Sequence, residues 1–481
     1  MSTVCACLTV VVAAIVGVWA VSMGGGLFGP DARYMVAAGR WILENGRLPE
    51  SDPLTVHAQL PYICQQWPVC IVLALVHDLM GEVALGYLFA IIDVFGALAL
   101  FSVSRRVGLK GAVPTALTCA TVFWMSVMEG STPRVLDVIC ITLCWGAAAR
   151  YLETRDPRIL AAFPLMGFLI VNIHGALWPC SLMLPLSMLI DARLDMRSRG
   201  HVVIAAVLTI CACMLNPYGV SMLALPFLTV GSDNPMLAGV LELRPMVPGF
   251  PGEAAFTLGS CVAVLALTAK RGGAARLFSY GCVMTVGLAA LSLMTRRNFL
   301  LYLAVLVLVS GEIIGMGKAQ ERDLFKDDLA ARVSVLMAGS VLVYTVFLLV
   351  SAIGTDSPRY VSQSTAFAAI QRAGIESGSS VLTDLDTGCE AELSSYRPTL
   401  DTRVEVFCGV YGGTDLLTPA AAALSGENTT IYCKKLGIVA TVLPDGYCDA
   451  AVSRLEEAGW AVVHDDGTTI ALVSPGAITG E

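Results

Sequence analysis

The chain has 481 residues, of which 56% are hydrophobic and only 14% are charged, and its mean hydropathy is +0.73. So few charges cannot surround a soluble core of this size, which excludes a soluble globular protein and predicts a polytopic membrane protein. The net charge of −8 comes from one end: residues 1–353 hold 23 basic and 21 acidic residues, whereas residues 354–481 hold 7 and 17. No basic face or groove is visible, so we expect no nucleic-acid partner.

Apolar runs of membrane length predict eleven transmembrane helices. The first run, residues 3–23, has no basic segment before it and is expected to be a retained signal anchor. With a cytoplasmic N-terminus every cytoplasmic loop is basic, as the positive-inside rule requires. The other ten runs lie at 83–103, 112–128, 135–149, 159–176, 177–191, 202–217, 254–269, 277–295, 298–316 and 334–353.

Residues 24–82 are predicted to form a first external loop with surface helices. The stretch FGPDARYMVAAGRWILENG, residues 28–46, places Tyr34, Met35, Ala38, Trp41 and Ile42 on one face of a helix. The stretch WPVCIVLALVHDLM, residues 67–80, is short for a crossing and is followed by only two residues before the next apolar run. We expect it to be a second surface helix or a re-entrant helix.

An odd number of crossings places the tail, residues 354–481, outside the cytoplasm as a small extracytoplasmic α/β domain next to a transmembrane domain of residues 1–353. Strands are expected in SSVLTDL and in PTLDTRVEVF, then a helix and a strand in residues 421–443. A final helix and hairpin follow, with a turn at Asp466-Gly467. The even number of cysteines in an exported tail would permit two disulfides, with three possible connectivities; they are Cys389, Cys408, Cys433 and Cys448.

Polar clusters that interrupt the apolar runs fall mostly on the outer side. Polar groups at membrane depth are costly unless they line a cavity or pair with one another, so we expect one outward-facing cavity. The clusters are Asp31, Gln65-Gln66-Trp67, Glu129 with Arg134 and Asp137, NIHG at 172–175, NPYG at 216–219, Glu242 with Arg244, and RRN at 296–298.

Several of these residues have a structural alternative. Asn216 precedes a proline and could simply end a helix, and His174 could be an interfacial histidine with satisfied hydrogen bonds. Asp31 could complement the dipole of its helix, or act as a general base at the membrane surface. Arg296 and Arg297 lie outside against the positive-inside trend, and paired guanidinium groups match phosphate oxygens.

Other acidic residues are less informative. Asp93 and Glu312 are intramembrane carboxylates that could be structural or belong to an ion path. The carboxylates of the tail are expected to be solvated rather than to bind metal; they are Asp384, Asp386, Asp401 and Glu405. No spacing typical of a structural zinc site is present, and no nucleotide-binding, α/β-hydrolase or zinc-protease motif.

Taken together, eight stretches resemble a large bacterial group of polytopic proteins that have a GT-C-type glycosyltransferase membrane region. This group contains relatives of dolichyl- or polyprenyl-phosphate-sugar-dependent transferases, including the RgtA/B/C/D-like proteins. Each motif is short, but their order covers almost the whole chain. The stretches are FGPDARYMVAAGRWILENGRLPESDP, YICQQWPVCIVLALV, VNIHG, LNPYG, LELRP, TRRNFLLYLAVL, LTDLDTG and LDTRVEVF.

The resemblance implies that a sugar moves, usually with inversion, from an isoprenoid phosphate to an acceptor outside the cytoplasm. It also implies an acidic catalytic base in the first external loop, a role that falls by position on Asp31. Where relatives often have a tryptophan pair and a histidine, this chain has Arg33, Tyr34 and Met35; where they often have a glutamate, it has Gln66. These differences remove groups that could bind metal, so no cofactor is predicted and dependence on a divalent cation is left open.

Two hypotheses follow. In the first, the chain is an integral-membrane glycosyltransferase of the cell envelope that uses a polyprenyl-phosphate-linked sugar, contacts membrane lipid and modifies an unidentified acceptor. In the second, it is a non-catalytic GT-C-like protein that binds or moves lipid-linked glycan, or an assembly factor that acts through its acidic tail. The first assigns catalysis to Asp31 and substrate binding to His174, Arg296, Arg297, Glu242, Asn216, Gln66 and Trp67.

Overall fold

The computed structural model describes residues 29–109, 134–230, 244–316, 358–409 and 414–478. The crossings predicted at 3–23, 112–128 and 334–353 lie outside these residues, as do Glu129 and Glu242. The boundary predicted between residues 353 and 354 also falls outside them, so the division into two domains stays a prediction.

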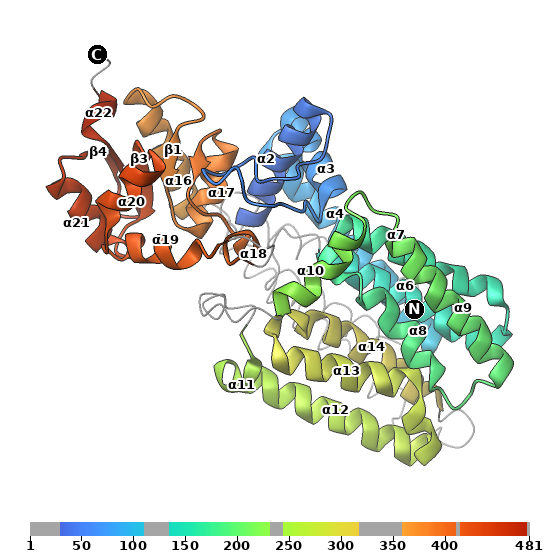
Figure 1. Ribbon diagram of the computed structural model, residues 1–481. Helices are drawn as coiled ribbons and strands as arrows, with labels where there is room; N and C mark the ends of the chain where they lie inside the picture. Colours follow the sequence, from blue (N-terminus) through green and yellow to red (C-terminus); the bar gives the residue numbers. More distant parts are fainter. Residues whose placement is uncertain (1–28, 110–133, 231–243, 317–357, 410–413, 479–481) are drawn as a thin grey trace.

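Apolar helices that pack side by side form a helical body (Figure 1). Four described segments are long and apolar enough to cross a membrane, namely Val135–Thr154, Met196–Cys213, Pro251–Gly272 and Arg296–Ile314. The chain is therefore a multi-pass membrane protein, and the side on which each loop lies stays a prediction. The helices of the body are α4 (Glu82–Val107), α6 (Arg134–Thr154), α7 (Ala162–Ile173), α8 (Cys180–Leu189), α9 (Met196–Cys213), α10 (Val220–Val230), α11 (Met246–Gly249), α12 (Pro251–Gly272), α13 (Tyr280–Met294) and α14 (Phe299–Met316).

The described apolar runs are helical, with two differences from expectation. The runs at 159–176 and 177–191 give only the short helices α7 and α8, because a 3-10 turn, Gly175–Leu177, and Pro179 separate them. Helix α10 was not predicted.

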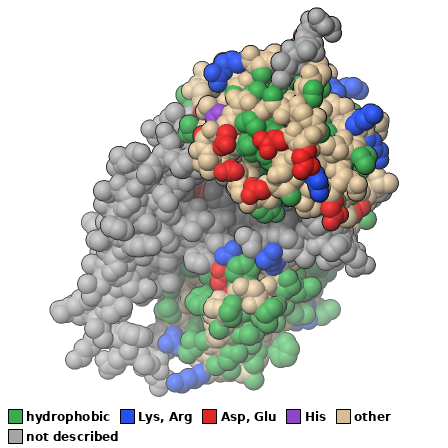
Figure 2. Space-filling view, turned by 90° about the vertical axis from the view of Figure 1, so that its left-hand side faces the viewer, with side chains coloured by type: hydrophobic (Ala, Val, Ile, Leu, Met, Phe, Trp, Pro, Cys, Tyr) green, Lys and Arg blue, Asp and Glu red, His purple; other side chains and the backbone are tan. Residues whose placement is uncertain are grey.

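The interior of the body is aromatic. The rings of Trp145 and Tyr280 meet edge to face, with their centroids 4.8 Å apart, and Tyr302 is fully buried. Its outside is apolar as well: Phe256 and Val262 on α12 are 48% and 64% exposed. Figure 2 shows hydrophobic side chains over this body and acidic side chains over the C-terminal region above it. An apolar outer surface of this kind is suited to lipid tails.

Residues 358–478, the C-terminal region, are built on a five-stranded sheet with the order β2-β1-β3-β5-β4. Strand β1 (Ser380–Leu382) runs parallel to β2 (Arg397–Pro398) and β3 (Ala440–Pro444). Strand β5 (Thr469–Val473) runs antiparallel to β3 and β4 (Ala461–Asp465). The helices around the sheet are α16 (Pro358–Arg372), α17 (Leu385–Leu393), α18 (Val404–Phe407), α19 (Leu417–Leu424), α20 (Thr429–Leu436), α21 (Asp449–Glu457) and α22 (Pro475–Ile478).

The hairpin predicted at Asp466-Gly467 is confirmed, because these residues connect β4 and β5. The strand predicted in PTLDTRVEVF is mostly wrong: only Pro398 belongs to a strand, and residues 404–407 form α18. The chain leaves the sheet because the Asp401 carboxylate accepts the backbone N–H of Arg403, at 2.6 Å, and closes a local turn.

The two disulfides considered for the tail are absent among its described residues. Cys389, Cys433 and Cys448 are buried thiols, and the Cys408 side chain, also buried, contacts the backbone oxygen of Glu405. The Cys389 sulfur contacts the hydroxyl of Thr402, and Cys433 and Cys448 pack in the hydrophobic core beside the sheet. They behave as small apolar side chains.

Both helices predicted in the first loop are present. Helix α2 (Pro30–Asn45) and helix α3 (Trp67–Met80) pack against each other beside the C-terminal region (Figure 1). They approach closely at Gly39, where an added Cβ would lie 2.0 Å from the carbonyl oxygen of Cys70. The first half of α2 is not a surface helix, because residues 32–39 are all buried, Arg33 included, between α3 and α17.

Substituting Gly39 by Ala should lower the stability of the α2–α3 pair by about 3 kcal/mol, because the new methyl group would meet a backbone carbonyl that cannot rotate away. The same substitution at Gly259 in α12, where nothing lies within 4 Å, is the control and should cause no loss. Thermal unfolding in detergent, with hydrogen exchange of α2, measures both. Equal midpoints and equal exchange for the two variants would contradict the close approach.

Candidate functional site

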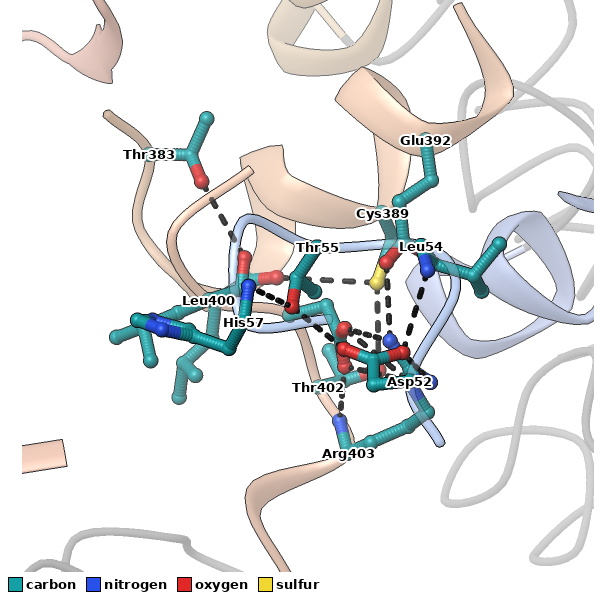
Figure 3. A network of polar contacts seen from close by, with 12 residues as sticks. Asp52, Leu54, Thr55, His57, Thr383, Cys389, Glu392, Leu400, Thr402 and Arg403 are labelled. Atoms are coloured by element: carbon teal, nitrogen blue, oxygen red, sulfur yellow. Dashed lines mark hydrogen bonds and ion pairs between the residues drawn. The ribbon is translucent and has the colours of Figure 1, made fainter. Parts of the chain in front are cut away.

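The first loop and the C-terminal region meet at a buried guanidinium group (Figure 3). Arg403 donates to Asp52 Oδ1 at 2.9 Å, to Glu392 Oε1 at 3.1 Å and to both oxygens of Asp401 at 3.0 Å. Only 2% of its surface is exposed. The ring of Tyr62 lies 4.7 Å from the guanidinium carbon. Residues separated by about 350 positions are thus joined in the protein interior.

This cluster contains more carboxyl groups than guanidinium groups. One guanidinium group faces the carboxyl groups of Asp52, Asp401 and Glu392. Burial, followed by the neighbouring Asp401 charge, raises the pKa of Glu392 well above its usual range despite Arg403. A proton on Glu392 would reduce the excess negative charge that burial penalises.

A second ion pair ties α2 to the C-terminal region. Arg33 pairs with Glu390 on α17 and lies 3.8 Å from Glu82. Further along α2, Arg40 binds Asp78 at 2.7 Å and the backbone oxygen of Leu393 at 3.3 Å. Arg33 therefore has a structural use: it helps to attach the C-terminal region to α2.

Gln65, Gln66 and Trp67 are the point where the motifs of the chain meet. The backbone oxygen of Gln65 accepts from Gly175 N at 2.9 Å, and its side chain accepts from Ala176 N at 3.1 Å and donates to Glu405 Oε1 at 3.2 Å. Trp67 donates to Asn172 Oδ1 at 3.2 Å. The first loop, the NIHG segment and the tail thus share one site.

Asp31 lies beside this segment. It occupies the first turn of α2 and is half-buried. Burial and then the Asp31 charge raise the pKa of Tyr34, whose hydroxyl donates to Gln66 Oε1 at 3.1 Å. Tyr34, Gln65, Gln66 and Glu405 line a small cavity with room for about one water molecule. Asp31 is thus adjacent to the predicted site, while Met35 is buried in the core.

His174 is held by Asp137 on α6. Its Nδ1 lies 2.6 Å from Asp137 Oδ2, and both side chains are buried. The other ring nitrogen, Nε2, is buried and has no hydrogen-bond partner. Sequence analysis singled out both residues separately but did not predict the pair, because their spacing of 37 positions carries no motif.

The two arginines of RRN have different surroundings. Arg296 donates to both oxygens of Glu253, each at 2.8 Å, and its guanidinium carbon lies 4.1 Å from the centre of the Phe250 ring. Arg297 lies close enough to Glu405 for its charge to lower the pKa of that residue, although burial has the larger, opposite effect and the net pKa is raised. Its buried Nε has no hydrogen-bond partner among the described residues. Arg297 thus differs from Arg296, whose guanidinium group is bound to Glu253.

Asn216 uses its side chain within its own turn. It donates to the carbonyl oxygens of Cys213 at 2.8 Å and Gly219 at 3.1 Å, and accepts from Tyr218 N at 2.9 Å. Tyr218 then donates to the backbone oxygen of Pro49 at 3.0 Å. The NPYG segment therefore supports the first loop, and the structural interpretation of Asn216 accounts for every polar atom of its side chain.

The remaining carboxylates are dispersed. Glu312 accepts from Tyr280 within the helical body, and Asp93 is buried in α4. In the C-terminal region Asp384 caps α17 through Thr387 N at 2.9 Å, whereas Asp401 binds Arg403. Among the described residues no group of three His, Cys, Asp or Glu side chains could hold a metal ion.

Glu405 and Arg403 were missed as site residues by sequence analysis. Both belong to LDTRVEVF, which was predicted to form a strand. The spacing of Asp401 and Arg403, which suits a local carboxylate–guanidinium pair, is the signal that could have found them.

Replacing Arg403 by Met should destabilise the contact between the first loop and the C-terminal region by about 3–5 kcal/mol, because the buried carboxylates lose their cation. Burial already raises the pKa of Glu392, and loss of the cation should raise it further. The folded variant then binds more protons than the unfolded chain, so its stability should recover as pH falls from about 8 to about 5. Unfolding midpoints at both pH values measure this.

Arg454→Met is the control, since Arg454 and Glu457 form an ion pair with both side chains more than 60% exposed; it should cost less than about 1 kcal/mol at either pH. Equal losses for the two arginines would refute the assignment of Arg403.

Comparisons with known proteins give the fold. No family model matches the chain, and no curated protein does. Among solved structures it is similar to the crystal structure of an Archaeoglobus fulgidus oligosaccharyltransferase tethered with an acceptor peptide via a disulfide bond. The TM-score is 0.54 at 12% identity, over 98% of this chain and 74% of that chain. At this identity the likeness concerns the fold alone: the chain is a multi-pass membrane protein with a GT-C-like fold.

Proposed function

We propose that this protein is an integral-membrane glycosyltransferase that moves a sugar from a polyprenyl-phosphate carrier to an acceptor outside the cytoplasm, with inversion. The observation that carries the proposal is the meeting of separate motifs at Gln65-Gln66-Trp67 within a GT-C-like fold. Two charges that act on partners of this segment support it: the Asp31 charge acts on Tyr34, which binds Gln66, and the Arg297 charge acts on Glu405, which binds Gln65.

In the proposed reaction the Asp31 carboxylate removes the proton of an acceptor hydroxyl. The oxygen attacks the anomeric carbon of the sugar, and the bond from that carbon to the phosphate oxygen breaks with its electron pair on the phosphate. Polyprenyl phosphate leaves and the anomeric configuration inverts. Asp31 suits the role of base because it is only half-buried in the first turn of a helix, where the helix dipole favours a carboxylate.

Arg297 is proposed to bind the donor phosphate. A guanidinium group that is not committed to an ion pair can make charge-assisted hydrogen bonds to phosphate oxygens. Those bonds strengthen as charge develops on the leaving phosphate. Arg296, which is bound to Glu253, is proposed to fix the segment that carries Arg297.

His174 is proposed to offer a hydrogen-bond acceptor to the substrate. Nδ1 donates to the Asp137 carboxylate, so Nε2 of the neutral ring is the acceptor. Among the described residues this Nε2 has no hydrogen-bond partner, and a ring fixed in this way is oriented for a ligand. The described residues do not supply a metal-binding set, so no step of this mechanism is assigned to a metal ion.

Asp31→Asn should reduce transfer about 10²- to 10⁴-fold, the usual contribution of a positioned general base, while donor binding is retained. Glu44→Gln, at the exposed end of the same helix, is the matched control. The assay uses purified protein in proteoliposomes, labelled polyprenyl-phosphate sugars and envelope extract as acceptor. Unchanged transfer by Asp31→Asn would remove Asp31 from the mechanism.

Arg297→Gln should impair use of the donor, whereas Arg296→Gln should impair stability. The first should lower kcat/KM for the donor about 10- to 100-fold at normal stability, through loss of charged hydrogen bonds to phosphate. The second should lower the unfolding midpoint, because Glu253 loses its partner at a cost of about 1–3 kcal/mol. Donor titrations and thermal unfolding of the two variants separate these effects; a donor defect confined to Arg296→Gln would reverse the assignment.

A second candidate function is non-catalytic binding or movement of lipid-linked glycan. The observation that favours it is that Arg33, Tyr34, Met35 and Gln66 are engaged in packing and attachment of the C-terminal region. Saturable binding of polyprenyl-phosphate sugar without transfer, across a panel of donors and acceptors, would support this alternative.

A further inference from the structure

Two cysteines flank the segment on which the proposed site depends. Cys64 immediately precedes Gln65, and Cys70 lies in the first part of α3. Their sulfur atoms are 3.8 Å apart, and both side chains are buried. Backbone hydrogen bonds from Trp67 N to Cys64 O, at 3.2 Å, and from Cys70 N to Gln66 O, at 3.0 Å, fold the segment so that the two side chains face each other.

Three other cysteine sulfurs contact oxygen instead. Cys389 lies 3.3 Å from the Thr402 hydroxyl, Cys408 lies 3.6 Å from the backbone oxygen of Glu405, and Cys213 lies 3.8 Å from the Ser181 hydroxyl. In each of these contacts the neighbour of the sulfur is an oxygen atom. The contact between Cys64 and Cys70 is different, because each sulfur meets a group with which it can form a covalent bond.

We propose that Cys64 and Cys70 form a disulfide bond that covalently closes residues 64–70 around Gln65-Gln66-Trp67. The inference rests on the topology of the proposed function, in which the first loop lies outside the cytoplasm, where disulfides form and persist. It does not depend on the transfer reaction itself.

The geometry needs little change. Closing the sulfur separation from 3.8 Å to a bond of about 2.05 Å requires a movement of less than about 1 Å from each sulfur, within the reach of small side-chain rotations. The Cys70 hydrogen bond lowers the pKa of the Cys64 thiol although burial opposes it, whereas the pKa of Cys70 is raised.

The oxidant is a disulfide-bearing oxidoreductase. The Cys64 thiolate attacks the oxidant's disulfide and forms a mixed disulfide, releasing one thiol. Cys70 then loses its proton, attacks the Cys64 sulfur and releases the second thiol of the oxidant. Two cysteine thiols are oxidised to one disulfide, and one disulfide of the oxidant is reduced to two thiols.

Burial of the two sulfur atoms determines when this reaction can take place. Arg403 and Glu405 of the C-terminal region line the same cavity as both cysteines, so an enzyme reaches the sulfurs before that region is attached. Once it is attached, a reductant is excluded. The disulfide should resist reduction in the folded protein and become reducible after denaturation.

The consequence is a more rigid site. Gln65 contacts both Glu405 and Ala176, and Gln66 accepts from Tyr34, so the closed loop restricts the residues that join the three parts of the site. A short closed loop also lowers the entropy of the unfolded chain, so its loss should lower the unfolding midpoint by several degrees.

The test is thiol labelling of the full chain. Membranes are lysed into denaturant with N-ethylmaleimide, and peptide masses are measured with and without prior reduction. Cys64 and Cys70 should be labelled only after reduction in denaturant, whereas Cys389 should be labelled without it. Dithiothreitol added to folded wild type should leave its unfolding midpoint unchanged, whereas dithiothreitol added together with denaturant should lower the midpoint measured afterwards. Neither treatment should change the midpoint of a Cys64→Ser/Cys70→Ser variant.

Labelling of Cys64 and Cys70 without reduction would overturn the proposal. Glu44→Cys, at an exposed position of α2, reports the topology through a membrane-impermeant maleimide on intact cells. If it is labelled from outside while Cys64 and Cys70 remain thiols, only the disulfide is wrong. If it is labelled only after permeabilisation, the topology shared with the proposed function is wrong as well, and the disulfide falls with it.

Discussion

The Arg403 guanidinium group is the interaction on which the arrangement of the site depends. It joins Asp52 of the first loop to Asp401 and Glu392 of the C-terminal region in the protein interior. A buried cation needs such partners, because an unpaired charge is far costlier than an unpaired dipole. Its position fixes how the C-terminal region meets α2, which then fixes the surroundings of Asp31.

This constraint gives the C-terminal region a role in the proposed site. Glu405 follows Arg403 by two residues and reaches both Gln65 and the charge of Arg297. The region is thus a wall of the site as well as a separate fold with its own sheet. Arg33 and Tyr34, which differ from the residues expected of relatives, serve that attachment.

Hydropathy and periodicity were sufficient to predict the described helices of the body, both helices of the first loop and the hairpin at Asp466-Gly467. Those elements follow from local patterns. The strand expected at residues 404–407 failed because a side chain, Asp401, competes for the backbone. The disulfides considered for the tail failed because sequence gives a count of cysteines and no distances.

The sequence predicted several residues of the candidate site, but it did not predict the contacts between them. Asp31, Gln66, Trp67 and Arg297 lie around or beside the shared segment, whereas Asn216 supports a turn and Arg296 is bound to Glu253. Glu242 lies outside the described residues. The difference between Arg296 and Arg297 arises from residues about 40 and 100 positions away in sequence, which no local motif can report.

The most direct test is a cryo-electron microscopy structure of the protein in a lipid nanodisc with a polyprenyl-phosphate sugar bound. We expect density for the phosphate at the Arg297 guanidinium group, with the anomeric carbon directed toward Asp31 and the Gln65-Gln66-Trp67 segment beside it. Phosphate bound away from Arg297, with Asp31 separated from the sugar by the packed first loop, would refute the proposed site.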